Sequence, residues 1–165
     1  MDAETVIELL GLIPLRNEGG FYRETYRSDE VVLQSALSPR YTTDKAFSTA
    51  VYYLETAREF SALHRLPTDE TYHFYLGDPV LLLRLYPDGR GDTVLLGNNL
   101  LAGQVPQATV PAGVWQGSRP VNGGFALLGT TMAPGFDFAD YAYGDPLDLS
   151  LLYPEFAGEI AALTR

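Results

Sequence analysis

Residues 63–77 read LHRLPTDETYHFYLG and decide the fold. Apolar, aromatic and β-branched residues on both flanks predict two strands, and the Leu-Pro-Thr-Asp segment between them is typical of a turn. Both histidines of the chain, His64 and His73, lie in this stretch, and Glu70 follows shortly after His64. On adjacent strands of one hairpin, His64 and Glu70 can point into the same cavity, so this pair is the first candidate site.

Further short strands are predicted on both sides of this stretch. Runs rich in Val, Tyr, Phe and Leu alternate with turn signals such as Pro87-Asp88-Gly89. The predicted strands are 21–28, 48–54, 60–66, 70–76, 80–86, 92–96, 107–110, 114–118 and 125–131. Short strands at intervals of about 8–12 residues, without alternating helices, indicate an all-β fold, here a jelly roll.

The two ends of the chain carry helical patterns. Residues 2–12 predict a short helix because Val6, Leu9 and Leu10 share one face. Residues 148–163 predict a weak helical tail. The length of the chain suits a single domain over residues 1–165.

Two longer segments are predicted as loops. Residues 29–44 mix polar and apolar side chains, and loops of this length are often functional or mobile. Residues 134–146 contain Phe136, Phe138 and Tyr141. These aromatic side chains can close over a cavity or tuck the loop onto the barrel, and aromatic residues mostly pack.

The central stretch resembles the first sequence motif of the cupins. His64, Glu70 and Gly77 fall on the spacing of a histidine, the glutamate and the glycine of that motif. Leu66 stands where the motif has its second histidine. The resemblance therefore keeps the spacing of the fold but loses one metal ligand.

The second cupin motif is also matched in part. Pro111 and Gly113 keep its Pro-x-Gly spacing, and Gln116 replaces its metal-binding histidine. The wider match includes Gly19 to Arg27 and Ala133 to Asp137. Together these segments resemble an uncharacterised family of small single-domain cupins.

The resemblance implies a double-stranded β-helix that is usually a homodimer. It also implies a likeness in fold to seed storage proteins and to sugar epimerases, some of which use a histidine base and a tyrosine without a metal. A barrel leaves open sheet edges, so we expect the strand at 21–28 to cover an edge of a partner chain.

Composition excludes several classes of function. The formal net charge of −10 argues against nucleic acid and mildly against anionic membranes. The absence of cysteine excludes disulfides, thiolate metal sites and a cysteine nucleophile. No apolar run reaches the length of about 18 residues of a membrane span, and no charged leader precedes one, so a cytoplasmic protein is expected.

The candidate metal ligands form a poor set. A first-row divalent ion prefers three or four imidazole and carboxylate ligands. The motif positions supply only His64 and Glu70, with Gln116 as a weak third. We therefore expect no cofactor beyond a weakly bound divalent ion.

Two functions remain open, apart from a purely structural His64–Glu70 pair. In the first, His64 is the general base of a metal-free epimerase or isomerase of a sugar-like substrate, with Glu70 and Tyr72 as its catalytic partners. In the second, the same pocket binds a carbohydrate or metabolite without turnover. The candidate ligand-binding residues are Tyr22, Arg23, His73, Phe74, Arg84, Trp115 and Gln116. His73 is expected on the opposite strand face from Glu70, and Arg84 is expected to pair with a carboxylate or bind an anion.

Overall fold

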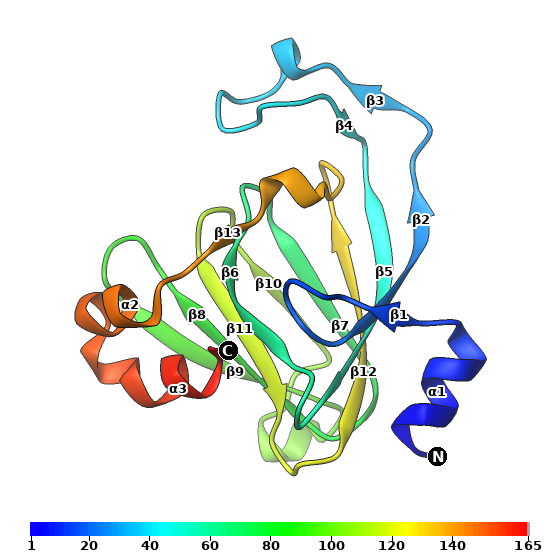
Figure 1. Cartoon of the computed structure of the whole chain (residues 1–165), viewed down its shortest axis with the longest axis vertical. Helices are drawn as coiled ribbons and strands as arrows, with labels where there is room; N and C mark the ends of the chain where they lie inside the picture. The colour runs from blue at the N-terminus through cyan, green and yellow to red at the C-terminus, as the bar shows by residue number, and fades with distance from the viewer. Residues whose placement is uncertain (165) are drawn as a thin grey trace.

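The computed structural model of the chain describes residues 1–164 and contains two antiparallel sheets that face each other as a barrel (Figure 1). The first sheet has the strand order β1-β2-β5-β12-β7-β10. Its strands are β1 (Ile13–Pro14), β2 (Phe21–Arg27), β5 (Thr49–Thr56), β7 (Glu70–Gly77), β10 (Gln107–Val110) and β12 (Phe125–Met132). The predicted all-β jelly roll is confirmed.

The second sheet has the order β13-β6-β11-β8-β9. Its strands are β6 (Ser61–Arg65), β8 (Val80–Leu85), β9 (Gly91–Leu96), β11 (Trp115–Pro120) and β13 (Ala142–Tyr143). The hairpin of β8 and β9 turns at the predicted Pro-Asp-Gly signal and pairs Arg84 with Asp92 across the strands. Short 3-10 turns occur at Gln34–Ala36, Leu100–Ala102, Phe138–Asp140 and Pro154–Phe156.

The largest apolar cluster lies where the inner faces of the two sheets meet. Leu82, Leu96 and Leu128 come from three different strands and are completely buried. Each follows the period-two alternation that places every second side chain inside a barrel. This cluster fills one part of the barrel and leaves the polar interior residues together elsewhere.

The connection from β6 to β7 differs from the predicted hairpin. β6 pairs with β11 and β13, whereas β7 pairs with β12 and β10, so the turn at residues 66–69 crosses from one sheet to the other. His64 and Glu70 consequently face each other across the interior instead of lying side by side on one sheet. Gly77 ends β7 with a φ of 103° beside the backbone of Phe125, which leaves no room for a Cβ atom.

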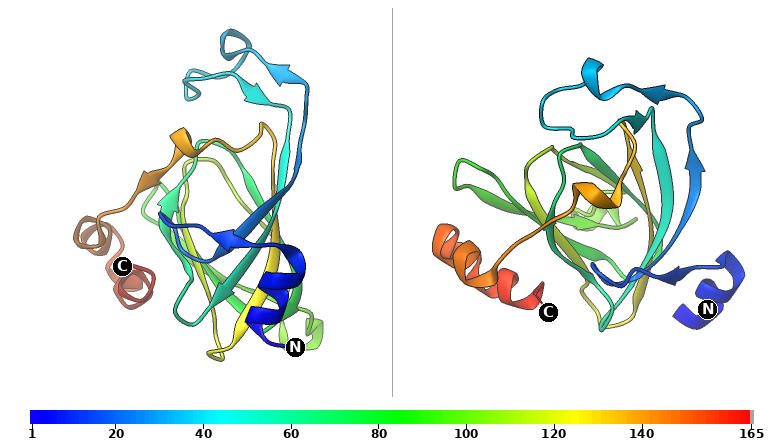
Figure 2. Two further views of the ribbon diagram at one scale, coloured as in Figure 1. Left: turned by 45° about the vertical axis from the view of Figure 1, so that its right-hand side comes forward. Right: turned by 45° about the horizontal axis from the view of Figure 1, so that its top comes forward.

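Helices lie outside the barrel at both ends of the chain (Figure 2). The helix α1 (Ala3–Leu10) lies within the predicted range, and it is capped by the side chain of Asp2 and ends at Gly11. The tail forms α2 (Pro146–Leu152) and α3 (Ala157–Ala162), which pack against Leu83 and Leu85 on the outer face of the second sheet.

An arm formed by residues 28–48 extends beyond the barrel (Figure 1). Residues 29–44 were predicted as a loop, but β3 (Val31–Val32) within them forms a short two-stranded ladder with β4 (Lys45–Ala46). Val31, Leu33 and Phe47 of the arm expose about half of their surface or more. The neighbouring β2 pairs with β5 along one edge, and β1 covers only Phe21 and Tyr22 of its other edge.

The exposed apolar side chains of the arm lead to a prediction about assembly. We expect a homodimer of twice 18.1 kDa in light scattering at micromolar concentration. A charge at the arm should weaken the dimer, so Leu33→Asp should shift the mass toward the monomer. Leu101→Asp is the matched control, because Leu101 is fully exposed elsewhere. A wild-type protein that stays at 18.1 kDa would contradict the prediction.

Candidate functional site

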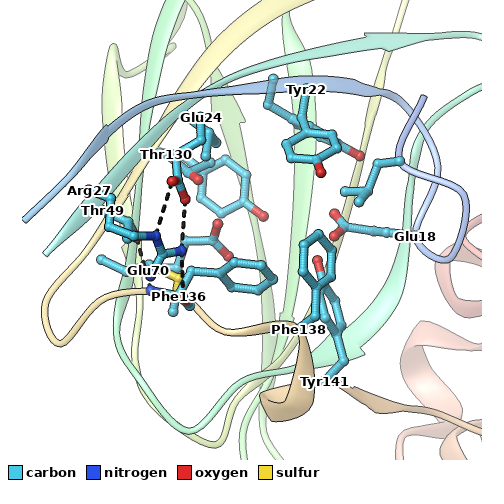
Figure 3. Close-up of a pocket in the computed structure, with 15 residues that line it drawn as sticks. Glu18, Tyr22, Glu24, Arg27, Thr49, Glu70, Thr130, Phe136, Phe138 and Tyr141 are labelled. Atoms are coloured by element: carbon cyan, nitrogen blue, oxygen red, sulfur yellow. Dashed lines mark hydrogen bonds and ion pairs between the residues drawn. The ribbon is translucent and has the colours of Figure 1, made fainter. Parts of the chain in front are cut away.

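A cavity of about 310 Å³ lies along the inner face of the first sheet (Figure 3). Strands β2, β5, β7 and β12 form its walls, and residues 134–143, named here the covering segment, lie across it. The lining residues are Leu15, Glu18, Tyr22, Glu24, Arg27, Thr49, Val51, Tyr53, Glu70, Tyr72, Thr130, Met132, Phe136, Phe138 and Tyr141. The aromatic residues of the 134–146 loop therefore do close over a cavity.

The covering segment is fixed to the barrel by polar contacts. Lys45 is buried at the base of the arm and donates to both carboxylate oxygens of Asp140, at 2.8 and 2.9 Å. Arg27 donates to the carbonyl of Phe136 at 3.0 Å, and the backbone N–H of Phe136 donates to the hydroxyl of Thr49 at 2.9 Å. These bonds hold the rings of the segment over the cavity.

Glu18 reaches the interior from the turn between β1 and β2. Gly20 has a φ of 72°, and a Cβ atom there would lie 2.7 Å from the hydroxyl of Tyr53, so only glycine lets the turn approach the sheet this closely. The Tyr53 hydroxyl donates to the carbonyl of Gly19 at 2.8 Å, and the N–H of Ala62 donates to the carbonyl of Glu18 at 3.1 Å. The turn is thereby held between both sheets with the Glu18 side chain buried.

His64 lies between two carboxyl groups that line the cavity. Its Nδ1 is 3.9 Å from Oε1 of Glu18, and its Nε2 is 4.0 Å from Oε2 of Glu70. Nδ1 also lies 2.8 Å from the carbonyl of Ala62, a distance at which an Nδ1–H donates. The carboxyl groups have their own donors, from the Ser61 hydroxyl to Glu18 at 2.5 Å and from the Gln116 amide to Glu70 at 2.8 Å. One imidazole thus lies within 4.0 Å of two carboxyl groups, close enough for its charge to act on both.

The charge state of His64 differs from the predicted one. Burial lowers the pKa of the imidazole, but the charges of Glu18 and Glu70 outweigh burial and raise the pKa to about 9. His64 is therefore an imidazolium at pH 7, which conflicts with its expected role as a neutral base at that pH. Burial raises the pKa of the Glu18 carboxyl, so this group holds a proton more readily than a solvated glutamate.

A further carboxyl group lies deeper in the barrel. Glu55 on β5 accepts a short hydrogen bond from the hydroxyl of Ser118 on β11. Burial raises the pKa of Glu55 to about 8, so its carboxyl group is largely neutral at pH 7. Its Oε2 and the Oε1 of Gln116 are buried atoms without a hydrogen-bond partner.

Three of the predicted site residues, Glu70, Tyr72 and Tyr22, line the cavity, whereas His64 and Gln116 lie behind its wall beside Glu70. Tyr72 lines the cavity beside Glu70, and burial raises the pKa of its phenol well above the usual range, so the hydroxyl remains a proton donor. Tyr22 lines the opposite part of the wall. Gln116 does not line the cavity, but its amide donates to Glu70, which does. Phe74 packs in the apolar cluster of the barrel.

Four predicted ligand-binding residues lie away from the cavity. Arg23 lies over the ring of Tyr52 on the outer face, and His73 is bound there to Thr131 and Gln107, as its odd spacing from Glu70 requires. Arg84 pairs with Asp92 at 2.8 Å, which is the carboxylate pairing predicted for it. Trp115 packs beneath the C-terminal helices.

Sequence reasoning missed Glu18, Glu24 and Arg27 as cavity residues. Glu18 lies in a turn, where no strand alternation indicates the direction of a side chain. Its neighbours Gly19 and Gly20 were the available signal, because paired glycines often mark a close approach of the backbone. Glu24 and Arg27 form a two-bond ion pair within one strand, at 3.0 and 2.8 Å.

Comparison with known proteins identifies the family of this barrel. The family model Cupin_5, described as Cupin superfamily (DUF985), matches residues 4–144. The chain belongs to the Cupin_5 family. An uncharacterised protein of Saccharomyces cerevisiae is 28% identical over 158 residues, which cover 88% of this chain and 78% of the yeast protein.

Two solved structures resemble the chain over nearly its whole length. A hypothetical protein from Leishmania major has 31% identity and a TM-score of 0.85, covering 99% of each chain. A protein from Shewanella oneidensis has 33% identity and a TM-score of 0.86, covering 100% of this chain and 98% of that one. Within residues 1–164, no helix is long and apolar enough to cross a membrane.

The donor set of this Cupin_5 chain does not fit the metal that the cupin motifs suggest. Leu66 is buried and apolar where the motif has a histidine, and the amide nitrogen of Gln116 is directed at Glu70. His64 offers neither nitrogen freely, because Nδ1 is bound to a carbonyl and Nε2 faces Glu70. Residues 1–164 contain no group of three His, Cys, Asp or Glu side chains placed to hold a metal ion.

Metal content is therefore a direct prediction. The protein purified without added ions should contain well under one equivalent of zinc, manganese, nickel or iron by elemental analysis, because only His64 and Glu70 offer good donors. One equivalent that survives a chelator would contradict it.

The buried titratable groups predict how stability depends on pH. Because the pKa of His64 is higher in the folded protein than in the unfolded chain, its charged form stabilises the fold fully below pH 6.5. This stabilisation is lost as the pH rises toward 9. The raised pKa of Glu55 acts in the same direction between pH 4.5 and 8. We expect the free energy of unfolding to fall by about 3 kcal/mol or more from pH 6.5 to 9.

Denaturant unfolding at several pH values measures this change. Glu55→Gln should reduce the decline between pH 4.5 and 6.5, to which Glu18 also contributes, but keep the decline above pH 8. His73→Gln is the control, because the second histidine lies on the outer face. A free energy that is constant or rises between pH 6.5 and 9 would show that His64 is not held as an imidazolium.

Proposed function

We propose that the cavity is the active site of a metal-independent isomerase or epimerase of a small hydroxy-carbonyl compound. One observation carries the proposal: a single buried imidazole faces Glu70 with one nitrogen and Glu18 with the other. Both carboxyl groups line the cavity, and they lie on different sides of it (Figure 3). A proton acceptor and a proton donor on two sides of a bound molecule are what inversion at a carbon requires.

The reaction begins at Glu70. Its carboxylate removes a proton from the carbon next to the substrate carbonyl, the C–H electron pair forms the C=C bond of an enolate, and the carbonyl π pair moves to oxygen. Tyr72 supplies a phenol O–H that can donate to this oxygen, because its raised pKa keeps it protonated. The proton that left the carbon is then held by Glu70.

Glu18 completes the reaction from the other side. In its protonated form, Glu18 returns a proton to the carbon while the enolate electrons re-form the carbonyl group, and burial raises the pKa of this carboxyl group. After the product leaves, Glu70 gives its proton to solvent and Glu18 takes one up from solvent, which restores both carboxyl groups. His64 stays an imidazolium throughout, and its charge favours the carboxylate form of Glu70.

The size of the cavity limits the substrate. A volume of about 310 Å³ is near the lower end of the range of about 300–1,000 Å³ for small-molecule pockets. A free sugar-sized molecule suits this volume better than a nucleotide-linked one. The proposed substrates are therefore small compounds that are not linked to a nucleotide.

Ligand binding without turnover is the alternative function. Ser61 and Gln116 already donate to Glu18 and Glu70, and a polar network that only supports a binding pocket would contain the same bonds. Aromatic walls with a few fixed polar groups are common in such pockets. The two functions differ in whether a carbon-bound proton exchanges with solvent.

Solvent exchange tests the proposal. A panel of small keto and hydroxy sugars would be incubated with the protein in deuterium oxide, and incorporation of label would be followed by mass spectrometry. Positioned acid–base groups contribute about 10²–10⁴-fold, so Glu70→Gln and His64→Gln should each reduce the exchange rate by about that factor. His73→Gln is the matched control and should leave the rate unchanged.

Two results would count against catalysis. Measurable binding of a panel member without any exchange would favour the binding function. Exchange that Glu70→Gln leaves intact would place the chemistry outside this cavity.

A further inference from the structure

The aromatic residues over the cavity form a box of rings set nearly at right angles. Tyr22 meets Phe138 at 6.2 Å between ring centroids, Phe138 meets Phe136 at 5.0 Å, and Phe136 meets Tyr141 at 5.5 Å. The planes of successive rings are inclined by 76–78°. Such rings turn faces and edges toward a common space, and the faces carry negative charge density.

The charged groups around this box are mostly acidic. Glu18, Glu24 and Glu70 line the cavity, and Arg27 is the cation among its lining residues. The His64 imidazolium lies behind this wall, within 4.0 Å of Glu18 and Glu70. The Arg27 guanidinium is already bound to the carboxylate of Glu24 by two hydrogen bonds and to the carbonyl of Phe136 by a third. An anionic ligand would therefore be repelled by the carboxyl groups, and the Arg27 donors are already in use. A cationic ligand would be attracted by the carboxyl groups and the ring faces.

Glu18 lies beside the aromatic box. In Figure 3 its carboxyl group points toward the space between Tyr22 and the rings of Phe138 and Tyr141. The side chain is nearly buried, with 6% of its surface exposed, so a charge placed next to it would be poorly screened by water. A carboxyl group next to aromatic faces is the pattern that binds organic ammonium ions.

We propose that the cavity recognises an organic ammonium group, so that its ligand is a small amine-bearing molecule, held by the faces of Tyr22, Phe138 and Tyr141 and by the carboxyl group of Glu18. The inference rests on the proposed function in taking this cavity as the substrate site. It narrows the substrate class to amino compounds such as amino sugars.

Calorimetric titration with two matched pairs of probes tests the inference. Choline is compared with its neutral isostere 3,3-dimethylbutan-1-ol, and D-glucosamine is compared with D-glucose. We expect the cation of at least one pair to bind about 10-fold or more tightly than its neutral partner. Equal affinity within both pairs, or no binding of either cation at millimolar concentration, would overturn the proposal.

Substitutions test whether the cation binds in the aromatic box. Phe138 is half exposed, so Phe138→Leu should fold normally while removing one ring face. It should weaken cation binding by about 5- to 30-fold and change binding of the neutral partner much less. Glu18→Gln should remove most of the preference for the cation. Tyr75→Leu is the control, because Tyr75 lies on the outer face beside Tyr52. Cation binding unaffected by both Phe138→Leu and Glu18→Gln would also overturn the proposal.

Failure of this inference can be told from failure of the proposed function. Cation binding without solvent exchange would remove the isomerase and leave the ammonium site. Exchange of neutral sugars without any preference for cations would leave the isomerase and remove the ammonium site.

Discussion

An imidazolium held between two carboxyl groups is the interaction on which the interior of this barrel depends. Glu18, His64 and Glu70 come from the β1–β2 turn, from β6 and from β7, which are elements of both sheets. Removing such a charge from water costs several kcal/mol unless a partner compensates it. His64 has two partners, and its exposed fraction of 1% shows how completely the fold encloses the group. The turn and both sheets must therefore be in place together.

This constraint divides the barrel into two parts with different chemistry. Leu82, Leu96 and Leu128 fill one part with apolar side chains. The other part collects the buried carboxyl, hydroxyl and amide groups, including the Glu55–Ser118 pair between β5 and β11. A carboxyl group such as Glu55 is tolerated there because it is largely neutral at pH 7. The apolar part stabilises the fold, and the polar part is free to serve a ligand.

The strands could be predicted from the sequence because their signal is local. Alternation and turn residues located β10 at its observed bounds and the other main strands within about two residues. The partners of β6 and β7 could not be predicted in the same way, since pairing across sheets depends on contacts far apart in the chain. Glu70 and Tyr72 were found through their motif and strand face, whereas Glu18 was missed because a turn has no period. Trp115 was predicted to bind the ligand, but it packs beneath the C-terminal helices, which are distant from it in the sequence.

The arm and the cavity are coupled through Lys45. This lysine belongs to β4 at the base of the arm, yet its ammonium group binds Asp140 in the covering segment. Both side chains are almost fully buried. If the two segments separated, each charge would lose a partner that water inside the protein could not readily replace. Phe136, Phe138 and Tyr141 lie on the same covering segment, so the Lys45–Asp140 pair ties the aromatic box to the arm, while Arg27 and Thr49 tie it to β2 and β5.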